Sequence, residues 1–498
     1  MNQSGDHLHR SWILVALMLT MMLAAMDTTI VSTAIPQIVG DLGGFALFSW
    51  VFSIYLLAQT VTIPVYGKLA DLFGRKPVLI FGVLIFLAGS AASAAAWNMT
   101  SLILFRGLQG LGAGSIMATV NTLAGDLYDI RERSRVQGWL SSVWGMAAIV
   151  GPALGGAFAQ YASWRWIFLI NLPIGIAALV LIGIFLHEKA PGRRHRVDFA
   201  GAGMMLVTGT VLIYTLLQGG QAWPWLSLQS TGLMILTVLL VAITIRMERR
   251  SADPIMPDWI WRDPVLIGAN LSVIGMGIIM IGPEMYLPVF SQSVLGLGAI
   301  TAGFVLASMS VGWPLTSALS GRLYLHIGFR NTALWGAVLI ILAAAGFWLL
   351  PYPGPVWLVV ADQIVLGGGF GLLSTPMLVG VQSVVTWDRR GVVTGANMFS
   401  RYLGQSVGAA LFGAVFNAAI GDALTGAPST LQARLPRQVN TVIQALQSGQ
   451  TGKAAERYLR HAFYIATHHI YIGLAVTGLM TLVVLLFTPR HFPVAEEK

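Results

Sequence analysis

The sequence contains no cysteine, and it has very little charge. Of its 498 residues, 10% are Asp, Glu, Lys or Arg, whereas a soluble globular chain carries about 25%. The lack of cysteine excludes disulfides, thiolate metal sites and a cysteine nucleophile. The lack of charge argues against a water-soluble core, which needs a charged shell. We also find neither a His-Glu-x-x-His helix nor a phosphate-binding Gly-rich loop ending in Lys-Ser/Thr. We therefore expect no enzyme, no cofactor and no metal site.

Long apolar runs take the place of the missing charge. Hydrophobic residues make up 56% of the chain, and runs of roughly 20 residues recur, each long enough to cross about 30 Å of hydrocarbon. The first run is too long for a signal peptide and contains Asp27. The predicted fold is an all-α polytopic membrane protein with about 14 transmembrane helices. The predicted spans are 12–34, 46–67, 77–96, 101–123, 136–159, 166–187, 198–217, 227–246, 265–288, 300–320, 331–350, 355–382, 394–416 and 462–487.

The basic residues follow the predicted topology. The net charge of +9 could indicate a nucleic-acid partner. However, if both termini are cytoplasmic, 21 of the 29 Lys and Arg residues fall in cytoplasmic segments, as the positive-inside rule requires. We therefore expect a multi-pass protein of the cell (inner) membrane with the lipid bilayer as its partner and no nucleic acid.

An internal repeat divides the chain. Residues 67–76 and 321–330 share the form G-[KR]-L-x4-G, and a glycine-rich helix follows each at a similar distance. The repeat predicts two six-helix bundles, residues 1–190 and 258–498, separated by two inserted helices with basic flanks in residues 191–257. The second bundle includes an outward loop, 417–461, which we expect to form short pieces such as Val439–Leu446. We interpret it as a passive loop, with a lid or docking surface as the alternative.

Few ionisable residues fall inside the spans, where each costs about 2.5 kcal/mol or more. Asp27 lies roughly four turns into the first span. A carboxyl balanced between burial and a nearby cation can bind a proton from one side and lose it when a cationic substrate arrives. Arg106 begins its helix on the outer side, so it can reach the depth of Asp27 and favour proton release. A purely structural pair is the alternative.

Other residues are candidates for substrate contact. Besides Asp27, we consider Glu284 and Asp362, with interfacial or structural roles as alternatives. Asp362 is expected near the outer start of its helix, whereas Arg401 is expected about two turns from the cytoplasmic end of the next helix. Pairing of these two residues is therefore not expected. The aromatic candidates are Phe52, Tyr55 and Tyr286, for which packing is the alternative. His468 and His469 are expected to be interfacial, at an outer helix start.

The segment Met26–Pro36 resembles the first-helix signature of the fourteen-span drug:proton antiporters of the major facilitator superfamily, and the likeness covers nearly the whole chain. This resemblance implies a proton-coupling role for Asp27. It also implies a cytoplasmic charge cluster that latches the outward-open state; its residues would be Gly67, Asp71, Gly74, Arg75 and Asp126. The second repeat has no acidic residue where the first has Asp71, since it continues with Tyr324 and Leu325 at this point, so the resemblance does not imply a symmetrical latch.

Three further segments extend the resemblance. Arg106, with Gly107, Gln109 and Gly110, is similar to the fourth-helix motif linked to proton transfer. The fifth-helix motif of exporters is represented by Gly151, Pro152, Gly155 and Gly156. The segment Trp164–Pro173 is similar to one typical of the fourteen-span branch.

Together these motifs imply a monomer that exports lipophilic, often cationic, compounds by alternating access, with protons as the coupling ion. Three alternatives stay open: a dedicated metabolite or antibiotic exporter, a lipid flippase, and an efflux subunit that needs a periplasmic adaptor.

Overall fold

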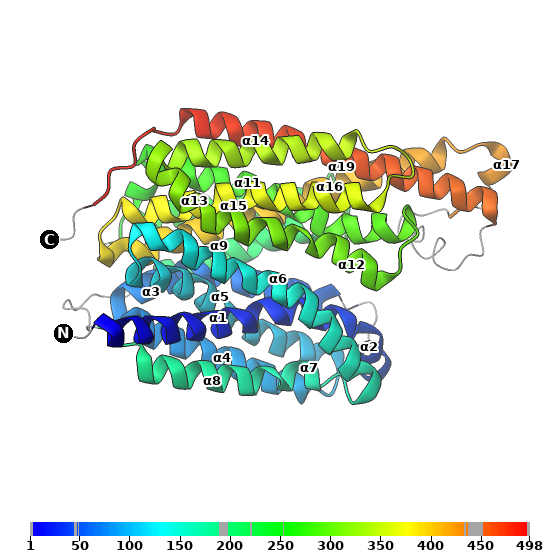
Figure 1. Ribbon diagram of the computed structural model, residues 1–498. Helices are drawn as coiled ribbons and strands as arrows, with labels where there is room; N and C mark the ends of the chain where they lie inside the picture. Colours follow the sequence, from blue (N-terminus) through cyan, green and yellow to red (C-terminus); the bar gives the residue numbers. More distant parts are fainter. Residues whose placement is uncertain are drawn as a thin grey trace.

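The computed structural model describes residues 3–43, 47, 49–188, 198–219, 222–251, 253–432, 435–436 and 452–495. Within these residues, 14 helical segments are long and apolar enough to cross a membrane. They run side by side along one direction, and both chain ends lie at the same end of the molecule (Figure 1). The predicted all-α architecture with 14 spans is confirmed.

The first six spans form one bundle. Leu17, Phe86, Ile116 and Leu140 are among the residues at its core, where α4 and α3 pack on α5 and α1 packs on α6. A short helix, α2 (Ile35–Leu42), follows the first span. The spans are α1 (Gln3–Thr33), α3 (Ser49–Phe73), α4 (Arg75–Ala94), α5 (Met99–Leu127), α6 (Ile130–Tyr161), and α7 (Trp166–Leu169) continued by α8 (Asn171–Phe185).

The last six spans repeat these contacts around a second core. Here α13 and α14 pack on α15, and α11 packs on α16. Two 3-10 helices, η2 (Asp258–Trp261) and η3 (Trp387–Arg389), precede α11 and α16, and α17 (Ser429–Gln432) follows α16. The spans are α11 (Pro264–Ser293), α12 (Ala299–Ala307) continued by α13 (Met309–Ile327), α14 (Phe329–Trp348), α15 (Val356–Ser383), α16 (Arg390–Thr425) and α19 (Lys453–Phe487).

The inserted pair, α9 (Phe199–Gln218) and α10 (Leu228–Glu248), is built with its polar residues inside. The buried residues of α10 are Ser230, Thr237 and Glu248. The hydroxyls of Thr208 and Thr244 join the two helices at 2.6 Å. Such an arrangement suits a lipid environment, where apolar side chains gain nothing by facing another helix.

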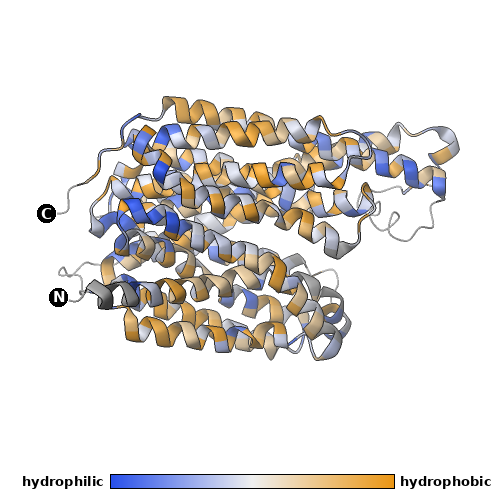
Figure 2. Cartoon of the chain, viewed as in Figure 1, coloured by the Kyte–Doolittle hydropathy of each residue, from blue (hydrophilic) through white to orange (hydrophobic). Residues whose placement is uncertain are grey.

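Apolar side chains cover the outside of the molecule. Phe81 on α4, Val238 on α10, Leu342 on α14 and Met480 on α19 are each more than half exposed. In Figure 2 the orange, apolar residues extend along the helices, and hydrophilic residues concentrate near the helix ends. The exposed apolar length of the helices is the surface that contacts lipid.

The outward segment differs from its prediction. The sequence predicts a loop over 417–461, but α16 continues to Thr425 and α19 already begins at Lys453. A helix satisfies its own backbone, so it can extend past the hydrocarbon with polar residues, as the ion pair of Glu456 with Arg460 at 2.7 Å illustrates. The predicted piece Val439–Leu446 and the basic flank 193–196 lie outside the described residues.

The earlier start of α19 also changes the position of His468. The predicted helix start at His468 is wrong, because His468 lies well inside α19, and the residue is 7% exposed. Its ring packs on the rings of Tyr464 and Phe347, with centroids at 3.9 and 5.5 Å. His469, the next residue, is exposed.

Glycines set the spacing between α4 and α5. A Cβ added at Gly112 would lie 2.6 Å from the carbonyl oxygen of Gly82 and 2.8 Å from the Cα of Phe86.

We expect Gly112→Ala to lower the midpoint of thermal unfolding in detergent, because overpacking costs about 1–3 kcal/mol. The matched control is Gly183→Ala in α8, where an added Cβ meets nothing within 4 Å. Equal midpoints for the two variants would show that this contact is not tight.

Candidate functional site

A charged cluster lies inside the first bundle, around Asp27. This residue on α1 is fully buried, and both of its carboxylate oxygens receive donors from α5. The Nη1 of Arg106 donates to Oδ2 at 2.5 Å, and the Nε2 of Gln109 donates to Oδ1 at 2.8 Å. Residues three apart share one face of a helix, so α5 presents both donors to the same carboxylate. The structure thus brings Asp27 and Arg106 together at one depth.

The Arg106 guanidinium also contacts an aromatic ring and a backbone carbonyl. It lies 4.3 Å from the ring centroid of Tyr55, and its Nε donates to the carbonyl of Val51 at 3.3 Å. Tyr55 is 1% exposed, so in this conformation it packs under the guanidinium and does not face an open surface. The Nη2 of Arg106 and the hydroxyl of Tyr55 are buried without a hydrogen-bond partner among the described residues.

A polar chain leads from this cluster into the neighbouring helices. Ser90 on α4 lies 3.4 Å from the Nε2 of Gln109 and donates to the carbonyl of Phe168 at 2.9 Å. The Nδ2 of Asn171 donates to the Ser90 hydroxyl, also at 2.9 Å. These bonds fix the Gln109 amide, and through it one oxygen of Asp27.

The fifth-helix motif lies on α6 against the helix that carries Asp27. An added Cβ at Gly151 would lie 2.9 Å from the Cβ of Thr29, which is two residues after Asp27. The Thr29 hydroxyl donates to the carbonyl of Ala147 at 2.9 Å. Pro152 is exposed, Gly155 is buried and Gly156 borders open space. The motif lets α6 approach α1 closely.

A second charged cluster joins the two bundles at the end that carries both termini. The carboxylate of Asp71, near the end of α3, accepts hydrogen bonds from the backbone nitrogens of Gly391 and Val392, both at 2.8 Å. Asp71 therefore caps the first turn of α16, where the helix dipole favours an anion. Arg75 holds the same carboxylate through Nη2 at 2.9 Å.

Asp126 at the end of α5 completes this cluster. Its Oδ2 accepts from the Nε of Arg75 at 2.8 Å, and its Oδ1 accepts from the Nη1 of Arg390 at 3.2 Å. Arg75 also donates to the carbonyl of Trp387 at 2.5 Å, and its guanidinium lies 3.7 Å from the Trp387 ring. Two carboxylates and two arginines thus tie α3 and α5 to the start of α16.

The glycines of this loop allow the close approach. A Cβ at Gly67 would lie 2.5 Å from the carbonyl oxygen of Gly391. Gly74 has φ of 95°, a conformation that side chains rarely adopt. The carboxylate of Glu188 accepts from the backbone nitrogens of Arg75 and Lys76 at 2.8 and 2.9 Å, which caps the start of α4.

The second repeat joins the bundles without a carboxylate. Tyr324, one residue before the position that corresponds to Asp71, donates from its hydroxyl to the carbonyl of Ile130 at the start of α6. Nearby, the hydroxyl of Ser134 donates to the carbonyl of Ala318 at 3.3 Å. We call these two contacts between the bundles seams. They differ chemically, because the seam at Asp71 is ionic and the seam at Tyr324 is neutral.

Several members of these clusters are not predicted as site residues from the sequence. Gln109 enters there only as part of a motif, although its spacing of three from Arg106 is a usable signal. Glu188, Trp387 and Arg390 are contributed from remote segments, and no local pattern links them to Arg75.

The remaining candidates lie in the second bundle or away from Asp27. The Oδ2 of Asp362 accepts from the Nε2 of Gln363 at 2.9 Å, and the same nitrogen lies 3.0 Å from the Tyr471 hydroxyl. Tyr286 packs on Phe416 with ring centroids at 4.7 Å. Phe52 is half-buried in the first bundle. Glu284 is half-buried and has no hydrogen bond to a described residue.

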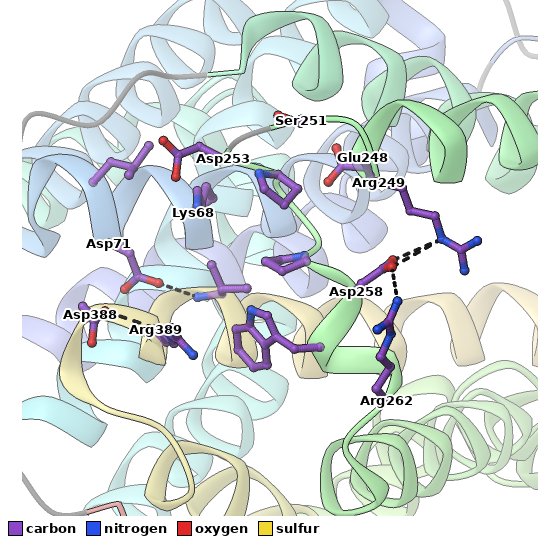
Figure 3. Close-up of a pocket in the computed structure, with 15 residues that line it drawn as sticks. Lys68, Asp71, Glu248, Arg249, Ser251, Asp253, Asp258, Arg262, Asp388 and Arg389 are labelled. Carbon is purple, nitrogen blue, oxygen red and sulfur yellow. Dashed lines mark hydrogen bonds and ion pairs between the residues drawn. The ribbon is translucent and has the colours of Figure 1, made fainter.

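A cavity of about 580 Å³ lies beside the ionic cluster. Figure 3 shows Lys68 and Asp71 on one side and the chain around η2 on the other, where Asp258 is bound by Arg249 and Arg262. Glu248 lines the cavity, and its Oε1 is buried without a partner among the described residues. The segment that leaves the inserted helices thus lies over the seam between the bundles.

Comparison with known proteins gives consistent results. The family described as the Major Facilitator Superfamily matches residues 17–409. The multidrug transporter protein MdtP of Bacillus subtilis is 33% identical over 90% of this chain and 83% of its own length. Multidrug resistance protein 3 of the same organism is 31% identical over 90% of this chain and 88% of its length.

A fungal relative and a solved structure extend the comparison. The efflux pump FUS6 of Gibberella fujikuroi is 32% identical over 82% of this chain and 75% of its own length. The crystal structure of the human organic anion transporter MFSD10 superposes with a TM-score of 0.66, covering 95% of this chain and 99% of that protein at 13% identity. At that identity the likeness concerns the fold alone.

Proposed function

This chain belongs to the major facilitator superfamily, and from that membership we propose that it is a proton-coupled drug exporter. It would lie in the inner membrane with both termini in the cytoplasm and would export lipophilic, often cationic, compounds. Relatives named as multidrug transporters and efflux pumps support the export of drugs. The observation that carries the coupling is the buried carboxylate of Asp27, held by Arg106 and Gln109.

The coupling follows from the chemistry of that carboxylate. Arginine stays charged in proteins, so Arg106 favours the ionised form of Asp27. When Asp27 binds a proton, its attraction to Arg106 is lost and the α1–α5 contact weakens. α1 also packs on the fifth-helix motif of α6, and α6 contacts the second bundle through Ile130 and Ser134. A change at Asp27 can therefore reach the contact between the bundles. Proton binding and release would thereby bias the rocking of one bundle against the other.

The ionic cluster supplies the second part of the cycle. In this conformation Asp71, Arg75, Asp126 and Arg390 hold the bundles together at the end with the termini. If that end is cytoplasmic, the conformation is the one that releases drug outward, and the cluster must break before new drug enters. The membrane potential adds about 2.3 kcal/mol per charge per 100 mV to each turnover.

Purified protein in vesicles tests this proposal. With an acid interior, inside-out vesicles should accumulate the cationic dye rhodamine 6G, and the dye should discharge the proton gradient. Accumulation without an added protein would exclude the adaptor-dependent alternative. Dye accumulation that persists after a protonophore collapses the gradient would contradict proton coupling. Movement of one metabolite and of no dye would instead indicate a dedicated exporter.

A further inference from the structure

Two opposite charges inside the second bundle have no part in the clusters described above. Arg401 lies within α16 and Glu284 lies within α11. Among the described residues neither makes a hydrogen bond or an ion pair through its side chain, and the Nε of Arg401 is buried without a partner. The other arginine placed this deep, Arg106, has its carboxylate. Ionisable residues within membrane spans almost always face the bundle interior or a water-filled cavity, and they mark the pathways of substrates or ions.

The two charges flank one contact between α11 and α16. Gly277, Met280 and Glu284 follow the spacing of one helix face, as do Arg401 and Gln405. An added Cβ at Gly277 would meet the carbonyl oxygen of Arg401, and the Nε2 of Gln405 lies 3.4 Å from the Sδ of Met280. Arg401 is also close enough to interact electrostatically with Glu284. The polar faces of both helices thus point toward a common region.

That region adjoins the seam between the bundles. The guanidinium of Arg401 lies 5.1 Å from the ring centroid of Tyr402. The Tyr402 hydroxyl accepts a hydrogen bond at 3.3 Å from the Nε2 of Gln59, which belongs to α3 of the first bundle. Transporters of this architecture bind their cargo near the bilayer midplane between the two repeats. Arg401 is therefore placed beside the path of the cargo.

We propose that Arg401 and Glu284 form a subsite that binds the carboxylate and the cationic group of a zwitterionic substrate. This inference rests on the proposed export function and specifies its substrate class. The planar guanidinium forms paired, charge-assisted hydrogen bonds with a carboxylate, and Glu284 attracts the positive end of the same molecule. A ligand that carries both charges supplies the partner that each residue lacks. A purely cationic ligand satisfies Glu284 but supplies no partner for Arg401.

A matched pair of dyes tests the subsite. Rhodamine 19 carries a free carboxylate and a cationic ring, and rhodamine 6G is its ethyl ester, so the two differ only in the anionic charge. We expect Arg401→Gln to weaken binding of rhodamine 19 to the purified protein by at least about tenfold, with rhodamine 6G changed less than about twofold. Arg401→Lys should restore part of the lost rhodamine 19 binding, because lysine returns the positive charge but not the planar pair of hydrogen-bond donors. Uptake into inside-out vesicles is measured in parallel.

The control variant is Arg135→Gln, which removes an exposed arginine near the start of α6 and should leave binding of both dyes unchanged. Unchanged rhodamine 6G binding shows that Arg401→Gln is folded. The inference is overturned if Arg401→Gln weakens both dyes equally or neither, or if the wild type does not bind rhodamine 19. If the binding difference is present but neither dye is transported along a proton gradient, the subsite stands and the proposed function fails.

Discussion

Asp27→Asn is expected to abolish proton-coupled drug export and to leave the chain folded in the membrane. Asparagine keeps one oxygen that can accept from Arg106 and has nearly the same shape, so the contact between α1 and α5 is weakened, as it is for protonated Asp27, but not lost. It cannot bind or release a proton in the working pH range, however, so the cycle loses its coupling step. Drug-induced discharge of the pH gradient should fall to the level of protein-free vesicles.

A second acidic residue near the same helix provides the control. Asp41, at the end of α2, is exposed, accepts from the Nε1 of Trp164 at 2.9 Å and lies 3.8 Å from Arg165. Asp41→Asn removes the same charge outside the buried cluster and should retain transport. Arg106→Ala is expected to lower the midpoint of thermal unfolding as well as transport, because it removes both the donor to Asp27 and the group that packs on the Tyr55 ring. Gradient-driven transport by Asp27→Asn at the wild-type rate would exclude this carboxyl as the coupling group.

Asp71→Asn is expected to shift the protein toward the state in which the end with the termini is open. The substitution removes the anion that accepts from Gly391, Val392 and Arg75. Hydrogen bonds to a charged group contribute about 1.5–3 kcal/mol each. Loss of even one such bond therefore shifts the equilibrium between the two states about tenfold to a hundredfold.

The absence of cysteine makes this shift easy to measure. A cysteine introduced at Ala396, which is 1% exposed beside Ile260 and Val392, reports on the seam without background labelling. A membrane-impermeant maleimide should label it faster in Asp71→Asn. The control is Asp388→Asn, because among the described residues that exposed carboxylate accepts a hydrogen bond only from Thr386 and forms one long ion pair with Arg389 at 4.0 Å. Slower labelling in Asp71→Asn than in the wild type would show that Asp71 does not hold this end closed.

The two seams between the bundles predict an asymmetric response to substitution. The ionic seam depends on charge, whereas the neutral seam has hydrogen bonds from the hydroxyls of Tyr324 and Ser134 to backbone carbonyls. A net neutral hydrogen bond contributes about 0.5–1.5 kcal/mol, less than one bond to a charged group. Opening of this end is therefore controlled mainly by Asp71 and its partners. The inserted helices add a segment over the same seam, since Trp259 of η2 lies 5.4 Å from the guanidinium of Arg389.

Several properties of this protein are determined by the sequence alone. Apolar runs long enough to cross a bilayer fix the number of spans, because the backbone must satisfy its own hydrogen bonds in lipid. The rarity of charge inside those runs singles out Asp27 and Arg106, since each such residue needs a compensating role. Helix length beyond the hydrocarbon is not determined in this way. Hydropathy does not register the polar turns of α16 and α19, so it misplaces the outward segment and His468.

Only the tertiary structure decides which residues meet. Asp71 caps a helix that begins more than three hundred residues later, and Asp126 is shared by Arg75 and Arg390 from different bundles. Tyr55 packs beneath the Arg106 guanidinium. Periodicity along one helix specifies the face on which a side chain lies, but not which other helix covers that face. That choice depends on the packing of all the helices at once, and it is what brings these charges together.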